Sequence, residues 1–142
     1  MDFRPAPVAY VVGFLFTLAI SPFAMKGGHH PLQVSGLIAG QAFNVEKAEI
    51  KPVSGGQRLT LRRGNHFAPE SEIQVWMTGD DHVSRVQYRH RVASNDLTAT
   101  EDWTQTAQTT LKLARQKHGV TFFELDLVHG PNRIHAEGDV AN

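Results

Sequence analysis

Residues 73–78, IQVWMT, and residues 86–92, VQYRHRV, decide the fold, and the turn residues Gly-Asp-Asp at 79–81 follow the first of them. Alternation of apolar with polar residues at a period of two places one side of a strand in a core and the other toward solvent. Both segments show it, with core-facing positions at Ile73, Val75, Met77, Val86, Tyr88, His90 and Val92. They therefore predict two neighbouring strands of an antiparallel sheet.

The same alternation extends through most of residues 43–140, with turn residues between the runs. Turns are predicted at 54–57 (SGGQ) and at 130–132 (GPN), and a bulge or bend where the phase shifts between Glu46 and Lys47. Short strands at regular spacing are typical of an antiparallel sandwich. We predict an all-β fold, an immunoglobulin-like or transthyretin-like sandwich. The expected core includes Phe43, Ile50, Leu61, Val75, Tyr88, Leu111, Phe123 and Leu125.

Residues 103–114 fit two patterns. Positions 103, 107, 111 and 114 have helical spacing, whereas alternate positions from 103 to 113 fit a strand. The threonines of this segment favour the strand because β-branched residues pack well on a pleated sheet. We expect a strand, joined through a turn at 117–119 to another strand at 120–128.

Residues 5–25, PAPVAYVVGFLFTLAISPFAM, contain no charged side chain. A helix of about 20 apolar residues spans a bilayer, so the segment predicts a transmembrane anchor. A cleaved signal peptide is the alternative, but Pro22 and Ala24 fit the small-x-small cleavage pattern poorly. The expected organisation is an anchor at 1–26, a Gly/His/Pro stalk at 27–31 and a β-sandwich at 32–142.

The predicted location is the inner membrane of a bacterium, with the anchor crossing once and the domain in the periplasm. A short N-terminal stub normally stays in the cytoplasm while the larger domain is exported, whereas basic residues near the two ends of the span are almost balanced. Ala9 and Gly13 lie four residues apart, a spacing that lets a neighbouring transmembrane helix approach closely. The expected partners are the lipid bilayer and integral membrane subunits.

Composition narrows the function further. The chain has 142 residues, equal numbers of basic and acidic side chains, and no cysteine. Zero net charge argues against a nucleic-acid partner, which favours a clustered basic surface. Without cysteine the chain has no disulfides, thiolate nucleophile or cysteine-ligated zinc. The sequence shows no motif for a cofactor, so none is expected.

Several motifs give the chain a family resemblance. The segments at 40–43 (GQAF) and 59–64 (LTLRRG) match a G-x-x-F opening and an L-x-L-R-x-G strand and turn, and 136–140 (AEGDV) is similar to a terminal strand. This pattern resembles small exported bacterial β-sandwich proteins of uncharacterised function. The resemblance implies an extracytoplasmic sandwich and no particular activity. The membrane anchor departs from the pattern.

Candidate site residues are few. His29, His30 and His82 could bind copper or zinc, although the first two also suit a polar interfacial stalk and the third a solvated turn. Arg85, Arg89 and Arg91 form a basic stripe that could pair with nearby acids; it is expected to be a solvated face, with a docking surface as the alternative. Glu124 and Asp126 share one strand face, where paired carboxylates are usually solvated.

The sequence contains no H-E-x-x-H, G-x-S-x-G or phosphate-binding glycine loop, so we expect a chain that is not an enzyme. The expected function is that of an accessory or stabilising subunit of a larger membrane complex, for example a respiratory or photosynthetic one. The alternative is a periplasmic metal- or ligand-binding module that uses surface histidines.

Overall fold

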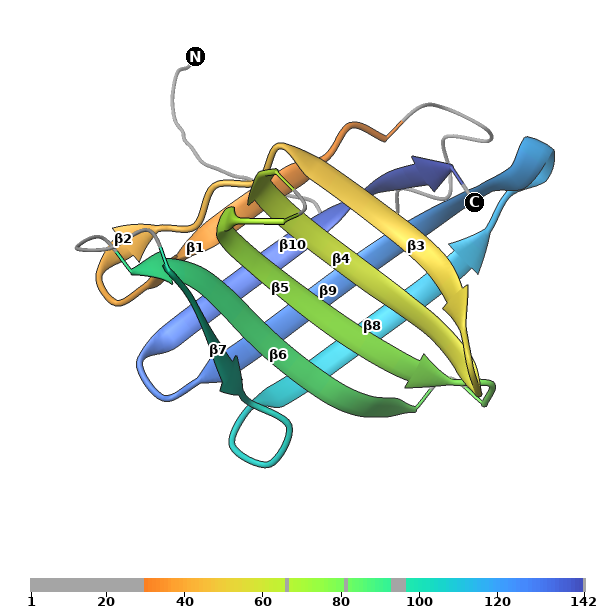
Figure 1. Cartoon of the computed structure of the whole chain (residues 1–142). Coiled ribbons are helices and arrows are strands. Elements are labelled where there is room, and N and C mark those ends of the chain that lie inside the picture. Colours follow the sequence, from red (N-terminus) through yellow and green to blue (C-terminus); the bar gives the residue numbers. More distant parts are fainter. Residues whose placement is uncertain (1–29, 66, 81, 93–96, 142) are drawn as a thin grey trace, which may run out of the picture.

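The domain is all-β in a computed structural model of the chain (Figure 1), which describes residues 30–65, 67–80, 82–92 and 97–141. Its elements are β1 (Gln33–Ile38), β2 (Gln41–Ala42), β3 (Lys47–Val53), β4 (Gly56–Gly64), β5 (Pro69–Thr78), β6 (Val83–Val92), β7 (Leu97–Asp102), β8 (Gln108–Arg115), the short 3₁₀ turn η4 (Lys117–Gly119), β9 (Val120–His129) and β10 (Asn132–Ala141). They form two five-stranded antiparallel sheets, in the orders β2-β1-β10-β9-β8 and β3-β4-β5-β6-β7. We call them sheet A and sheet B.

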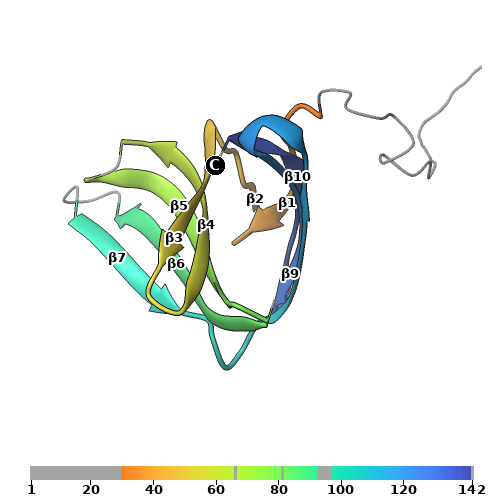
Figure 2. The same ribbon diagram turned by 90° about the vertical axis from the view of Figure 1, so that its right-hand side faces the viewer.

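The two sheets face each other across one hydrophobic core (Figure 2). Alternate residues of β5 and β9 point into it, as the period of two predicts. Of the expected core residues, Tyr88 is half-buried, and the others are at most 7% exposed: Phe43, Ile50, Leu61, Val75, Leu111, Phe123 and Leu125. The arrangement is that of a β-sandwich.

Strand order follows the chain closely. Every neighbouring pair of strands is consecutive in sequence except β1 with β10, which joins the first two strands of the chain to sheet A. The result is a meander, and this order differs from the Greek-key connections of the immunoglobulin-like sandwich that we expected. Short turns explain the difference, because a two-residue connection such as 54–55 or 130–131 only allows the next strand to pair with the one before it.

The pairing of β1 with β10 in sheet A depends on one glycine. Gly36 of β1 pairs with Ile134 of β10 and has a φ of 132°. A Cβ atom at this position would lie 2.0 Å from the carbonyl oxygen of Arg133. Only glycine therefore allows β1 to approach β10 closely enough to pair with it.

Residues 103–114 divide into a turn and a strand. The strand β8 begins at Gln108 and pairs with β9, which confirms the hairpin through 117–119. Before it, the backbone N–H of Ala107 donates to the carbonyl of Trp103, as in one turn of a helix. The helical spacing of 103 and 107 thus belongs to this turn, and the alternating pattern from 109 to 113 belongs to the strand. The predicted strand start at Trp103 is wrong by five residues because Trp103 fills the core from a turn.

The described residues start where the predicted stalk ends. The His30 backbone N–H donates to Asp139 at 2.9 Å, and the Asp139 N–H donates back to the His30 carbonyl at 2.9 Å. The chain is therefore attached to β10 from residue 30 onward. Among the residues that the structure describes, no helix is long and apolar enough to span a membrane. The predicted anchor, with Ala9, Gly13 and residues 5–25, lies outside them, as does His29.

Candidate functional site

A cavity of about 580 Å³ opens between the two sheets at one end of the domain. The ends of β1, β4, β6 and β7 line it, together with the start of β5 and the connection from β2 to β3. Because several strands end here, side chains from distant parts of the sequence meet in one place. Its size suits a small ligand.

Three rings of a stacked row, those of Tyr88, His90 and Trp103, line this cavity. Trp103 lies 4.9 Å from Tyr88 on one side and 4.2 Å from His129 on the other, and Tyr88 stacks on His90 at 4.9 Å. Glu101 fixes two of these rings, because its carboxylate accepts from Trp103 Nε1 at 3.1 Å and lies 3.1 Å from His90 Nε2. His90, expected on the core-facing side of its strand, lies at the cavity beside Glu101 and not in the closed core.

Charged groups line another part of the cavity. Arg63 donates to Glu70 at 2.7 Å, and Arg91 lies at the edge of the cavity. Partial burial raises the pKa of Tyr88, and the negative charge of Glu101 raises it further, so its hydroxyl stays protonated at neutral pH. The cavity therefore offers aromatic faces and fixed polar groups, which suit a planar, polar molecule.

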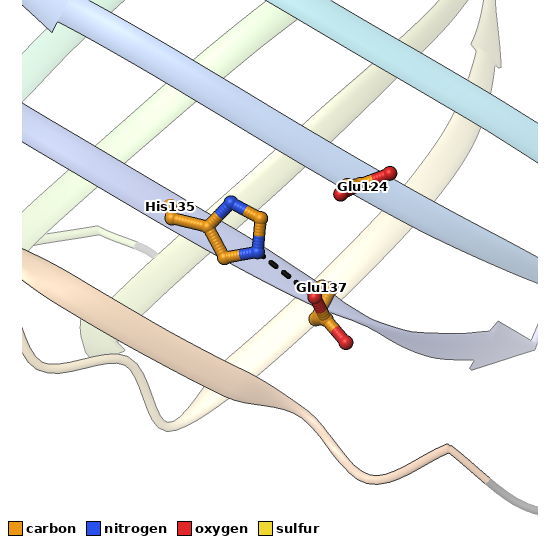
Figure 3. A group of neighbouring side chains, drawn as sticks. All are labelled: Glu124, His135 and Glu137. Carbon is orange, nitrogen blue, oxygen red and sulfur yellow. Dashed lines mark hydrogen bonds and ion pairs between the residues drawn. The ribbon is translucent and has the colours of Figure 1, made fainter. Parts of the chain in front are cut away.

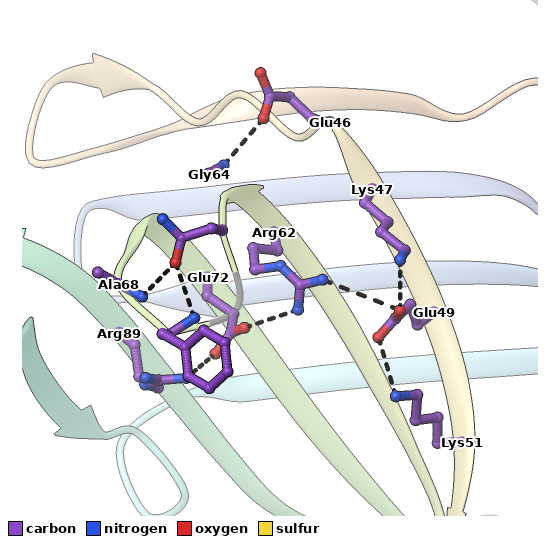
Figure 4. A network of polar contacts seen from close by, with 11 residues as sticks. Glu46, Lys47, Glu49, Lys51, Arg62, Gly64, Ala68, Glu72 and Arg89 are labelled. Atoms are coloured by element: carbon purple, nitrogen blue, oxygen red, sulfur yellow. Dashed lines mark hydrogen bonds and ion pairs between the residues drawn. The ribbon is translucent and has the colours of Figure 1, made fainter.

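The outer face of sheet B carries a network of charged side chains centred on Glu72 (Figure 4). Glu72 is fully buried and accepts from Arg89 at 2.7 Å and from Arg62 at 3.4 Å. These two arginines are on the strands on either side of Glu72, directly opposite it in register. A buried carboxylate needs such partners because an unpaired charge in the interior is very costly.

The network continues to the edge strand β3. Lys47 and Lys51 lie 2.9 Å and 3.8 Å from the carboxylate of Glu49, and Arg62 lies 4.0 Å from it. The hydrogen bond from Lys47 lowers the pKa of Glu49, and the nearby positive charges outweigh the opposing effect of burial. Sheet B thus presents more positive than negative groups on its outer face. The basic residues on this face include Lys47, Lys51, Arg58, Arg62, Arg85, Arg89 and Arg91, and the acidic ones include Glu49, Glu72 and Asp102.

The predicted arginine stripe divides into three environments. Arg89 pairs with the buried Glu72, which confirms that this stripe meets nearby acids. Arg85 lies over the ring of Trp76 at 4.6 Å, and Arg58 lies 5.9 Å from the same ring on the neighbouring strand. Arg91 is exposed at the end of β6. Arg85 is exposed as well, and with the half-buried ring of Trp76 it forms an accessible pair.

Two of the predicted metal ligands, His30 and His82, are among the described residues, and each lies beside a carboxylate of its own. His30 Nδ1 is 3.1 Å from Asp139, and its ring packs 4.8 Å from Phe122 on sheet A. His82 is in the turn between β5 and β6, 79% exposed and 3.7 Å from Asp80. Within the described part of the chain, neither histidine belongs to a group of three potential ligands.

A different group of potential ligands lies on the outer face of sheet A (Figure 3). Glu124 of β9 and His135 and Glu137 of β10 have ligand atoms within 4.8 Å of one another. His135 Nδ1 lies 2.7 Å from Asp126 and Nε2 lies 2.8 Å from Glu137. Burial opposes protonation of the ring, but these hydrogen bonds and charges together raise the pKa of His135.

Sequence reasoning missed this group because its residues belong to two strands. The available indication was a pair of i, i+2 patterns, E-x-D at 124–126 and H-x-E at 135–137, each of which places two polar side chains on one strand face. Only the register of β9 against β10, which sets Glu137 opposite Glu124 and His135 opposite Asp126, joins the two pairs.

Comparison of the chain with protein-family models, with curated proteins and with solved structures gave no match. The functional argument therefore depends on the geometry of these surfaces. The resemblance to exported bacterial sandwich proteins stays a prediction.

Proposed function

We propose that this chain is a non-catalytic accessory subunit of a larger membrane complex, anchored once in the bacterial inner membrane and binding its partner with a periplasmic sandwich. The observation that carries the proposal is Trp76 between Arg85 and Arg58 on the outer face of sheet B. Tryptophan and arginine are the residues most enriched among those that dominate binding energy at protein interfaces. The apolar segment 5–25 supports the membrane part of the proposal.

Charge distribution indicates what kind of partner surface fits. The whole chain is neutral, yet the outer face of sheet B is mainly basic. Arg62 and Arg89 are already paired with Glu72, whereas Arg85 is exposed and available. The matching surface is an acidic one with an apolar or aromatic group for Trp76, on the periplasmic side of an integral membrane subunit.

Changing this surface tests the accessory role. In the full chain extracted with mild detergent, Trp76→Ala combined with Arg85→Glu is expected to reduce the co-purified membrane subunit at least about tenfold, because one interface anchor is worth more than 1.4 kcal/mol. Arg133→Glu, a charge reversal on sheet A, is the matched control and is expected to leave the yield unchanged. A photo-crosslinker at position 85 should reach the same subunit, and one at position 133 should not. Equal losses in both variants would contradict the proposal.

A second candidate function is binding of a small planar, polar molecule, favoured by the cavity with its stacked Tyr88 and Trp103. The chain has two tryptophans, so Trp76→Phe leaves Trp103 as the only indole reporter. Titrating this full-chain variant with nucleosides and aromatic amino acids is expected to give a saturable change in its emission. Tyr88→Ala should abolish that change by removing the stacked wall. If no compound changes the emission of Trp103, binding of nucleosides and of aromatic amino acids in this cavity is excluded.

A further inference from the structure

Three potential metal ligands are fixed on one rigid part of the domain. Glu124 and Glu137 are directly opposite each other on β9 and β10, and His135 is two residues from Glu137 on the same strand face. One ligand atom from each lies within 4.8 Å of the others, and all three side chains are half-buried (Figure 3). The site is independent of the cavity and of the outer face of sheet B.

We propose that Glu124, His135 and Glu137 bind one divalent transition-metal ion, with Zn²⁺ the best fit and Asp126 as a positioning residue. One imidazole nitrogen with two carboxylate oxygens is a donor set that zinc accepts, whereas Mg²⁺ and Ca²⁺ take oxygen ligands. Three protein ligands leave the fourth position for water.

The contact between Asp126 and His135 carries the proposal. Histidines that bind metals commonly donate their second ring N–H to a carboxylate, which fixes the ring orientation. Here Asp126 Oδ1 lies 2.7 Å from His135 Nδ1, and this leaves Nε2 directed at Glu137, 2.8 Å away. Because a carboxylate only accepts hydrogen bonds, Nε2 carries a proton in the metal-free arrangement. Zinc replaces this proton, which leaves to solvent, and Nε2 and Glu137 then both bind the ion.

The size of the group allows this exchange. Ligand atoms about 2.0–2.2 Å from a tetrahedral zinc lie about 3.4 Å apart. The widest separation in the group, within 4.8 Å, therefore has to shrink by about 1.4 Å, whereas Nε2 of His135 and Glu137, now 2.8 Å apart, have to separate slightly. His135 and Glu137 are 37% and 30% exposed at the side chain, so their outer atoms have room to rotate. The paired backbones of β9 and β10 need not move.

The test is zinc binding to the full chain in mild detergent, measured by competition with a chromophoric chelator. We expect one tight Zn²⁺ site per chain, lost in Glu124→Gln and in His135→Gln. Asp126→Asn is expected to keep the site but to weaken it by about 10–100-fold, because the imidazole loses its orienting carboxylate. His82→Gln is the control for the other surface histidines and should bind Zn²⁺ as the unmodified chain does.

Two further measurements make the result decisive. The thermal midpoint of each variant without zinc shows that the domain is folded, which is expected because three of the positions are on the outer face of sheet A and His82 is in an exposed turn. A large excess of Mg²⁺ should leave Zn²⁺ binding unchanged. Zinc binding that survives in Glu124→Gln and His135→Gln, or that disappears equally in His82→Gln, would overturn the proposal.

Discussion

Replacing Glu72 with glutamine is expected to lower the free energy of unfolding by about 3–5 kcal/mol, the cost of removing one partner from a buried ion pair. Glu72 has no exposed surface and balances both Arg62, whose side chain is 9% exposed, and Arg89. The neutral amide would leave the Arg62 guanidinium buried with only the more distant Glu49 near it. Urea unfolding of the full chain in detergent, followed by tryptophan fluorescence, measures the change.

Glu70→Gln is the matched control for this prediction. It makes the same chemical change on the same strand, but the Arg63–Glu70 pair is 42% and 47% exposed at the side chains. Exposed pairs contribute about 0–1 kcal/mol, because water screens them and solvates each charge when the other is removed. If the two variants lose the same stability, Glu72 is not the buried centre of the network.

Leu125→Ala is expected to cost about 2–5 kcal/mol, the range for a leucine truncated in a packed core. Leu125 is fully buried in the middle of β9, where it pairs with Leu111 on one side and Ala136 on the other. The strands on both sides of β9 are held by hydrogen bonds in the sheet, so they cannot move in to fill the space that the shorter side chain leaves. The midpoint of urea unfolding should fall while the slope of the transition stays the same.

The same substitution at Leu37 is the control for burial. Leu37 is on β1 of the same sheet but is 51% exposed. Leu37→Ala is therefore expected to change stability by no more than about 0.5 kcal/mol. A large loss at Leu37, or none at Leu125, would contradict the division into inner and outer strand faces.

The all-β class and most of the core could be predicted from the sequence alone. Ile73 and Val75 alternate with polar residues on one strand, as Phe123 does on another, and all three are buried. The alternation predicts burial because each strand places one face in the core. The turns at 54–55 and 130–131 were predictable for a similar local reason. Glycine allows backbone angles that other residues avoid, and proline fixes its own φ, wherever in the chain they occur. Each of these features depends on residues within a few positions of one another.

Segments without a clear local pattern were not predicted. β1 has glycine at position 36, which lowers strand propensity, and β7 has its apolar residues at Leu97 and Ala99 with no core contact to favour either face. Both pair with strands that are already formed, β10 and β6. Trp103 was placed in a strand because it is in phase with the alternating positions from 103 to 113, whose threonines favour a strand.

Charge distribution was also decided by the fold. The sequence predicts a basic stripe along one strand, but only the pairing of β4, β5 and β6 gathers Arg62 and Arg89 around Glu72. Pairing of β9 with β10 gathers Glu124, His135 and Glu137 on the other. Long-range register, not local sequence, creates both surfaces.

What the sequence by itself determined is therefore the class of the fold, its inward-facing residues, its main turns and an apolar segment at 5–25. What only the tertiary structure decided is the meander order, the cavity beside Trp103, the burial of Glu72 and the group of possible zinc ligands. The physical reason is the range of the interactions. Alternation and turn formation act between near neighbours in the chain, whereas a site needs side chains that only strand pairing brings together.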